Sequence, residues 1–253
     1  MSYYGISDIG LVREENQDYC AALELCENAE LFVVCDGMGG ENGGKLASSK
    51  AGAAFCELIS ERVSGIVQNG KIPLRRKKDI PSILVSAVEY ANTTIFEIAS
   101  SDRTLKGMGT TLVSALIVDS TAFIVNIGDS RAYISYYDNI KQITKDHSYV
   151  QFLIDMGKIT PEEAVNHPQK NVITRSVGAT ENVIADIFKI SLVDGQYILL
   201  CTDGLSNSVS ESELAKALKK DEPLKNKAEG LVRLAKLHES TDNITALIIK
   251  FEK

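Results

Sequence analysis

Aspartate residues repeatedly stand at the ends of short apolar runs in this chain. Four apolar runs have an aspartate at one end. Three are followed by one: residues 31–35 by Asp36, 123–128 by Asp129 and 197–202 by Asp203. The fourth run, residues 244–249, is preceded by Asp242. Because aspartate is disfavoured inside strands, these residues mark strand ends. One Asp-Gly pair at a strand end is usually only a turn, which is our interpretation of Asp194-Gly195. The recurrence over several strands indicates more than turns.

Carboxylates gathered at neighbouring strand ends repel one another, which raises their pKa values and destabilises the fold. A bound cation relieves this repulsion, and oxygen ligands favour Mg²⁺ or Mn²⁺. A backbone carbonyl beside a glycine can add a ligand, and two ions about 4 Å apart activate a bridging water for attack on phosphorus. Arg13, close to Asp18, offers a planar fork that matches phosphate oxygens. Its alternative is a salt bridge to Glu14 or Glu15, or plain exposure.

Composition restricts the class of protein. With 253 residues and 44% hydrophobic residues, the chain can bury a large core. A net charge of −7 argues against nonspecific nucleic-acid binding. No apolar run reaches membrane-spanning length, and no signal peptide is evident, so we expect a cytoplasmic protein. Five cysteines without a C-x-x-C pair and three histidines argue against zinc and disulfides, and favour free thiols in a reducing cytosol.

Apolar periodicity predicts helices at residues 45–63, 82–100, 211–220 and 224–238, with further strands at 111–118, 121–127 and 131–136. This order favours mixed α+β over alternating βαβ. Residues 148–171 read as a small helical insertion, a candidate flap. Residues 65–79 contain the run Arg75-Arg76-Lys77-Lys78, which is either a docking patch for an acidic partner or, as we favour, a solvated loop.

Two alternative chemistries have weaker support. Residues 39–45 match G-x-x-x-x-G-K, but Leu46 stands where a P-loop needs Ser or Thr, and Asn42 breaks a dinucleotide fingerprint that begins at Gly37. Residues 56–62 match C-x-x-x-x-x-R, but they lie in an amphipathic helical pattern without free backbone N–H groups for a phosphate. We interpret both matches as chance.

Eight short motifs in order resemble the metal-dependent serine/threonine protein phosphatases of the 2C type, the PPM family, and especially its small bacterial members. They occupy residues 7–18, 36–40, 107–111, 128–131, 144–148, 173–178, 203–205 and 241–245. The resemblance therefore extends over essentially the whole chain. It implies a four-layer αββα sandwich of two antiparallel sheets flanked by helices, forming one catalytic domain over residues 1–253 with a flap at about 148–171.

The resemblance also implies the site. Asp36 would bridge two Mn²⁺ or Mg²⁺ ions, with the Gly37 carbonyl as a further ligand. Asp203 and Asp242 would complete the second metal position. Asp18 would contact a metal ion through water, Asp129 would help to hold a weaker third ion, and Arg13 would bind the substrate phosphate.

The implied reaction is hydrolysis of phosphoserine and phosphothreonine in proteins by a bridging water, without a phosphoenzyme. Implied partners are phosphoprotein substrates of a cognate serine/threonine kinase, and the chain is expected to act as a monomer. Met38, Glu41 and Lys45 depart from common family patterns. The alternative is a catalytically weak regulatory or phospho-binding module of the same fold. We favour the enzyme because Asp36, Asp203 and Asp242 are all present.

Overall fold

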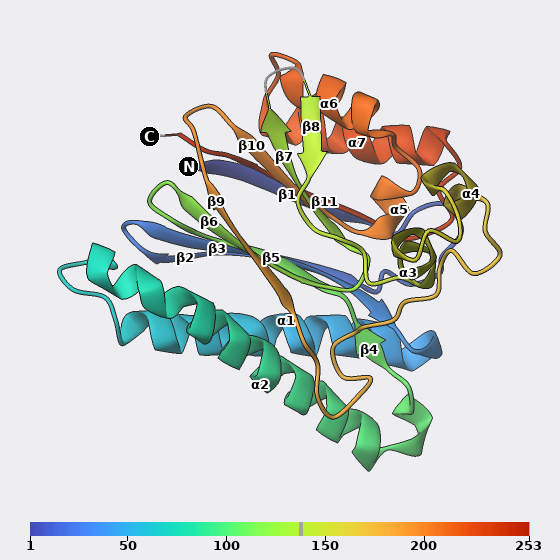
Figure 1. Ribbon diagram of the computed structural model, residues 1–253, viewed down its shortest axis with the longest axis horizontal. Coiled ribbons are helices and arrows are strands. Elements are labelled where there is room, and N and C mark those ends of the chain that lie inside the picture. The colour runs from blue at the N-terminus through green and yellow to red at the C-terminus, as the bar shows by residue number, and fades with distance from the viewer. Residues whose placement is uncertain (137–138, 253) are drawn as a thin grey trace.

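Two antiparallel sheets form the centre of the fold (Figure 1). The computed structural model describes residues 1–136 and 139–252, and their side chains except those of residues 40–42 and 136. One sheet has the order β1-β11-β10-β7-β8, with bounds Ser2–Asp8, Ile244–Lys250, Tyr197–Cys201, Arg131–Tyr136 and Asn139–Gln142. The other has the order β2-β3-β5-β6-β9, with bounds Asp18–Cys26, Ala29–Met38, Leu112–Val118, Thr121–Ile127 and Asp186–Ser191, and short β4 (Gly109–Thr110) also pairs with β3.

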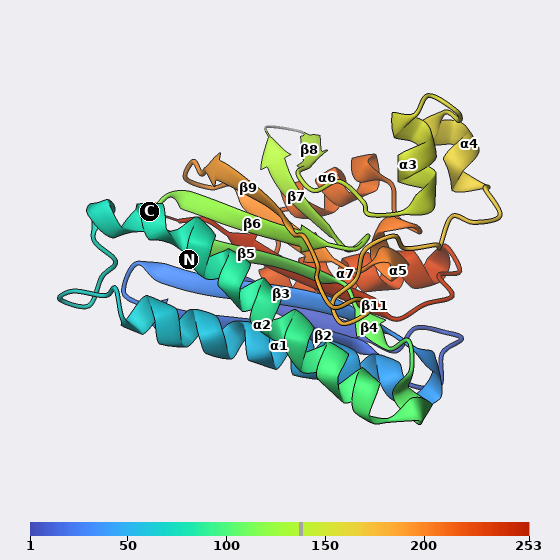
Figure 2. The same ribbon diagram turned by 60° about the horizontal axis from the view of Figure 1, so that its bottom comes forward.

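Helices cover both outer faces of the sheet pair (Figures 1 and 2). Helices α1 (Gly40–Ser64) and α2 (Ile80–Ser101) pack on the β3 sheet, and α6 (Glu211–Lys219) and α7 (Leu224–Leu237) pack on the β11 sheet. Three apolar layers result, one between the sheets and one under each helix pair. This is the predicted αββα sandwich, and the fold class is confirmed.

The apolar runs are continuous because the central strands are buried on both faces. In β3, Phe32 and Val34 face the other sheet, whereas Leu31, Val33 and Cys35 face the helices. Edge strands lack this signature. The apolar-run criterion misses all four of them, which are β1, β2, β8 and β9, because one side of each is partly open to solvent.

The helix predicted at residues 45–63 begins earlier, at Gly40. Most of the glycine-rich segment 39–45 therefore forms the first turns of α1 and does not form an open phosphate-binding loop. This agrees with the interpretation of the G-x-x-x-x-G-K match as chance. The predicted helices 82–100, 211–220 and 224–238 correspond closely to α2, α6 and α7.

The basic run lies in a short 3-10 turn, Leu74–Asp79, between α1 and α2. Three of its four cations have local partners: Lys77 contacts Asp119 at 2.6 Å, Arg76 contacts Asp79 at 2.9 Å and Arg75 contacts Gln68 at 2.9 Å. This segment is at the far left of Figure 1, away from α5 (Asp203–Ser206). The arrangement fits a solvated loop better than a docking patch.

Residues 148–171 contain two short helices, α3 (Tyr149–Asp155) and α4 (Pro161–Val165). They form a small projection at one end of the sandwich (Figure 2). Ser148 caps α3, and a capping box of Thr160 and Glu163 begins α4. All five cysteines are free thiols. In the described part of the chain, no helix has the length and apolar character required to cross a membrane.

Candidate metal centre

Three of the predicted ligands come from strand ends of both sheets and meet at one edge of the sandwich. Asp36 lies near the end of β3, Asp203 begins α5 one residue after the end of β10, and Asp242 lies just before β11. Asp36 continues the alternation of Phe32 and Val34, so its side chain points between the sheets. The three residues line a cleft of about 810 Å³ together with Arg13, Gly37 and Asp129.

Strand register brings Asp18 to the same place. Asp18 of β2 pairs directly with Asp36 of β3, so both side chains lie on one face of their sheet. The opposite sheet contributes two hydroxyl groups: Thr202 Oγ1 lies 2.9 Å from Asp18 Oδ2, and Thr245 Oγ1 lies 2.6 Å from it. Asp18 thus connects the two sheets beside Asp36.

Two glycines permit the close backbone packing at this edge. A Cβ atom at Gly37 would lie 2.0 Å from the carbonyl oxygen of Gly44 in α1. A Cβ atom at Gly204 would lie 2.0 Å from the carbonyl oxygen of Asn243. The absence of these side chains lets Asp36 approach α1 and lets Asp203 lie next to Asp242.

Burial and mutual repulsion raise the pKa values of four aspartates, burial being the larger cause in each. The pKa of Asp36 lies well above its usual range because the carboxyl is buried and Asp18, Asp203, Asp129 and Asp242 add negative charge. Burial raises the pKa of Asp18 to about 7, against the opposing hydrogen bonds from Thr245 and Thr202. It raises that of Asp129 to about 8, and it also raises that of Asp203 with help from Asp242.

Several oxygens in this cluster have no hydrogen-bond partner. Asp18 Oδ1, Asp129 Oδ1 and Asp203 Oδ1 are all buried and unpaired. Unpaired buried carboxylate oxygens are costly, and a hard divalent cation would satisfy them. Among the described residues, no three His, Cys, Asp or Glu side chains converge closely enough to hold an ion by themselves. The fit is therefore to an ion that keeps several waters and also uses a backbone carbonyl, as Mg²⁺ and Mn²⁺ do.

Asp129 lies in the turn between β6 and β7, and His147 orients this turn. The backbone N–H of Gly128 donates to His147 Nδ1 at 3.1 Å, and Nε2 lies 3.1 Å from Arg175 Nη1 and 3.3 Å from Asp186 Oδ2. Burial lowers the pKa of His147. The side chain is buried and engaged on both nitrogens, so we assign it a structural role.

Arg13 pairs with neither Glu14 nor Glu15. Its Nη2 donates to Asp242 Oδ2 at 2.7 Å, and its side chain is 52% exposed. This contact, the strongest cause, raises the pKa of Arg13. The guanidinium therefore lies in the cleft beside the carboxylates, where it could receive an anionic group.

Asn243 anchors the loop that carries Arg13. Its Nδ2 donates to the carbonyls of Ile9 at 2.9 Å and Glu15 at 3.0 Å, and its Oδ1 accepts from the N–H of Gln17 at 2.9 Å. Three bonds from one side chain fix the loop to the residue next to Asp242.

Comparison with known proteins decides the family. A family model described as protein phosphatase 2C matches residues 12–237. The chain belongs to the protein phosphatase 2C family. The predicted family is confirmed, and so is the predicted enzyme class of serine/threonine phosphatase.

Relatives within the protein phosphatase 2C family match over nearly the full chain. The serine/threonine phosphatase stp of Listeria innocua is 34% identical over 244 residues, 96% of this chain and 93% of that protein. Protein phosphatase PhpP of Streptococcus pneumoniae is 34% identical over 252 residues, 98% of this chain and 96% of that protein.

Solved structures of the family agree. The serine/threonine phosphatase of S. agalactiae has a TM-score of 0.88 and 32% identity, covering 100% of this chain and 99% of that one. The catalytic domain of the phosphatase PstP in complex with two manganese ions has a TM-score of 0.84 and 33% identity, covering 100% and 98%. Metal dependence in this family is thus supported by a structure of the same fold.

Some residues of this 2C-family site escape sequence reasoning. Thr202 and Thr245 support Asp18, and Asn243 holds the Arg13 loop. The two threonines do have a signal: they continue the alternation of inward-facing residues in β10 and β11. Asn243 lies within the motif at residues 241–245, but the sequence gives no sign of its anchoring role, because its partners are more than 200 positions away.

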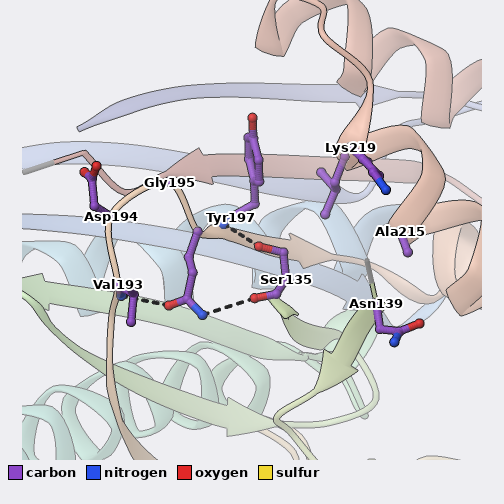
Figure 3. A pocket seen from close by; sticks show the side chains of 10 residues that line it. Ser135, Asn139, Val193, Asp194, Gly195, Tyr197, Ala215 and Lys219 are labelled. Carbon is purple, nitrogen blue, oxygen red and sulfur yellow. Dashed lines mark hydrogen bonds between the residues drawn. The ribbon is translucent and has the colours of Figure 1, made fainter. Parts of the chain in front are cut away.

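This chain has a further cavity of about 470 Å³, shown in Figure 3. It shares no lining residue with the carboxylate cleft. Gln196 bridges it, accepting from the N–H of Val193 at 2.8 Å and donating to the carbonyl of Ser135 at 3.2 Å. The N–H of Tyr197 donates to Ser135 Oγ at 2.7 Å. These bonds join β7 to β10 beyond the point where their ladder ends, which is a structural role.

Proposed function

We propose that this protein hydrolyses phosphoserine and phosphothreonine in proteins with two Mn²⁺ or Mg²⁺ ions bound in the carboxylate cleft. The observation that carries the proposal is the set of buried, unpaired aspartate oxygens around one cleft. A relative of the same fold, the catalytic domain of PstP, has been solved with two manganese ions.

In this proposal Asp36 would serve both ions, and the Gly37 carbonyl, Asp203 and Asp242 would be further ligands. Asp18 would act through water: Thr202 and Thr245 hold its Oδ2, and its unpaired Oδ1 would accept from a water on an ion. Asp129 helps to hold a weaker third ion. When bound, the ions neutralise these carboxylates and activate a water for direct attack on phosphorus, without a phosphoenzyme.

The chain's own residues hold the substrate and leave room for the reaction. Arg13 presents its guanidinium to the substrate phosphate, and Asn243 keeps its backbone in position. The described lining of the cleft contains no cysteine, serine, threonine or histidine side chain. This lining supports attack by water in place of a side-chain nucleophile of those types.

We further propose one catalytic domain with a flap at residues 148–171 that faces the substrate. Asn171, at the end of this segment, lines the cleft, as does Ile173 two residues later. The substrates would be phosphoproteins made by a serine/threonine kinase in the same compartment. The free thiols support a reducing cytosol, and we propose a monomer.

Phosphate release from a phosphothreonine peptide tests the proposal. We expect turnover with Mn²⁺, loss of turnover with EDTA, and loss in Asp36→Asn even with Mn²⁺. Asp194→Asn is the matched control, since Asp194 lies in an Asp-Gly turn outside the cleft. Well-folded wild-type protein that binds Mn²⁺ but turns over no phosphopeptide would favour a regulatory or phospho-binding module.

A further inference from the structure

A groove lies next to the carboxylate cleft, on the segment that follows the flap. It has a volume of about 320 Å³, and its lining includes Ile173, which also lines the cleft. Its other walls are formed by residues 174–176, 179–180 and 182–184. A chain bound with one residue in the cleft could therefore extend into this groove past Ile173.

Hydrogen bonds to the site fix the floor of this groove. The N–H of Thr174 donates to the carbonyl of His147 at 2.7 Å, and His147 in turn orients the Gly128 turn. Val177 and Thr110 exchange backbone bonds at 2.8 and 3.0 Å. The floor thus has a fixed position relative to Asp129 and β4.

A buried amide fixes the groove's outer wall. Asn92 of α2 is 1% exposed, and its Oδ1 accepts from the N–H of Gly178 at 2.7 Å. Its Nδ2 donates to the carbonyls of Thr180 and Glu181, each at 3.0 Å. A preformed wall of this kind binds a ligand without a large ordering cost.

The groove lining combines four aliphatic residues with uncharged polar groups and one arginine. Ile184 is 75% exposed, although most isoleucines in the chain are buried. Thr174, Thr180 and Asn182 supply hydrogen-bonding groups. The one charged lining residue, Arg175, is paired with Asp186 at 3.1 Å. The carboxylate cleft next to it has the opposite character.

We infer that this groove binds an aliphatic side chain of the substrate polypeptide, located a few residues from the phosphorylated one. This inference rests on the proposed function and specifies its substrate class: phosphopeptides with an uncharged flank that carries Leu, Ile or Val. Ile173 lines both the cleft and the groove, which favours the substrate itself as the occupant. The volume suits one or two side chains, and the uncharged polar groups suit the peptide backbone beside them.

A leucine scan tests this inference. Phosphothreonine peptides of Ala and Ser carry one Leu at each of the four positions on either side of the phosphothreonine, and kcat/KM is measured for each. We expect Leu at one or two positions on one side to increase kcat/KM about tenfold, as burial of one aliphatic side chain does. Ile184→Glu should abolish this preference while hydrolysis of p-nitrophenyl phosphate stays within twofold of wild type.

The control is Val193→Glu, which places the same charge on an exposed aliphatic residue in the separate cavity of Figure 3. It should keep the leucine preference. Equal kcat/KM for all peptides in the wild type, or a preference that survives in Ile184→Glu, would overturn the inference. Lack of turnover of both peptides and p-nitrophenyl phosphate by the wild type would instead refute the proposed function, so the two failures are distinguishable.

Discussion

Arg13 Nη2 lies 2.7 Å from Oδ2 of Asp242, so the proposed phosphate-binding residue and a proposed metal ligand share one ion pair. The other oxygen, Oδ1, accepts from the N–H of Asn243 at 2.8 Å. A cation that binds Asp242 through Oδ2 must share this oxygen with the guanidinium or displace it. Phosphate binding and metal binding are consequently linked through Asp242.

Arg13→Ala tests this link. Without the guanidinium, Asp242 is free for the ion, and we expect Mn²⁺ to bind two- to fivefold more tightly in the absence of substrate, the range for a partly exposed ion pair. The same variant loses its phosphate contact, so KM for a phosphopeptide should rise about tenfold. Calorimetry and steady-state kinetics measure the two effects. Lys45→Ala, which breaks the nearby pair with Glu15, is the control, and weaker Mn²⁺ binding in Arg13→Ala would contradict the link.

Asp36→Asn should affect thermal stability in opposite directions with and without metal. Burial and four neighbouring carboxylates raise the pKa of Asp36, so in EDTA the folded chain must either bear their repulsion or take up a proton. The neutral amide avoids both costs and should raise the melting temperature by several degrees. With saturating Mn²⁺ the wild type should gain stability from binding, whereas the variant should gain much less. Thermal denaturation by circular dichroism checks both arms. Equal stabilisation of the two proteins by Mn²⁺ would show that Asp36 is not a ligand.

The raised pKa values predict how stability depends on pH. Asp18 and Asp129 have pKa values of about 7 and about 8 in the fold, against an ordinary 3.8. A carboxyl with a raised pKa binds more protons in the folded than in the unfolded chain, so folding stability falls as pH rises through this window. In EDTA we expect the free energy of unfolding to decrease from about pH 5 to pH 8. Urea denaturation at several pH values measures this slope.

Metal should counteract this pH dependence. Cation binding requires the deprotonated carboxylates, so Mn²⁺ affinity should increase over the same pH range and offset the loss of stability. Asp129→Asn in EDTA should show a shallower decrease, because one of the titrating groups is gone. A slope that is unchanged in this variant would argue against Asp129 as one of its sources.

Asn243→Asp tests the anchor of the Arg13 loop. The substituted carboxylate can still accept from the N–H of Gln17, but it cannot donate to the carbonyls of Ile9 and Glu15. We expect a loss of about 1–3 kcal/mol in unfolding free energy and a higher KM for phosphopeptide. Asn207→Asp, at the residue that follows α5 and donates to Asp203 Oδ2, is a comparison for an added charge at the cleft without loss of the loop anchor. An unchanged KM in Asn243→Asp would show that the anchor does not position Arg13.

Much of the fold follows from local sequence. The central strands β3, β5, β10 and β11 appear as continuous apolar runs because both of their faces are buried, and the long helices appear through their periodicity. The edge strands do not, since their one-sided burial gives a weaker pattern. The predicted start of α1, residue 45, is also five residues too late, because a glycine-rich sequence favours a loop unless packing compensates.

The sequence by itself determined which residues could bind cations, since aspartates at strand ends mark one edge of the sheets before any pairing is known. Only the tertiary structure decided which of them meet. Register sets Asp18 opposite Asp36, the second sheet supplies Thr202 and Thr245, and Asp242 receives Arg13 from 229 positions away. These relationships depend on strand order and on packing between the sheets. Such contacts join distant parts of the chain, and local sequence propensities therefore do not predict them.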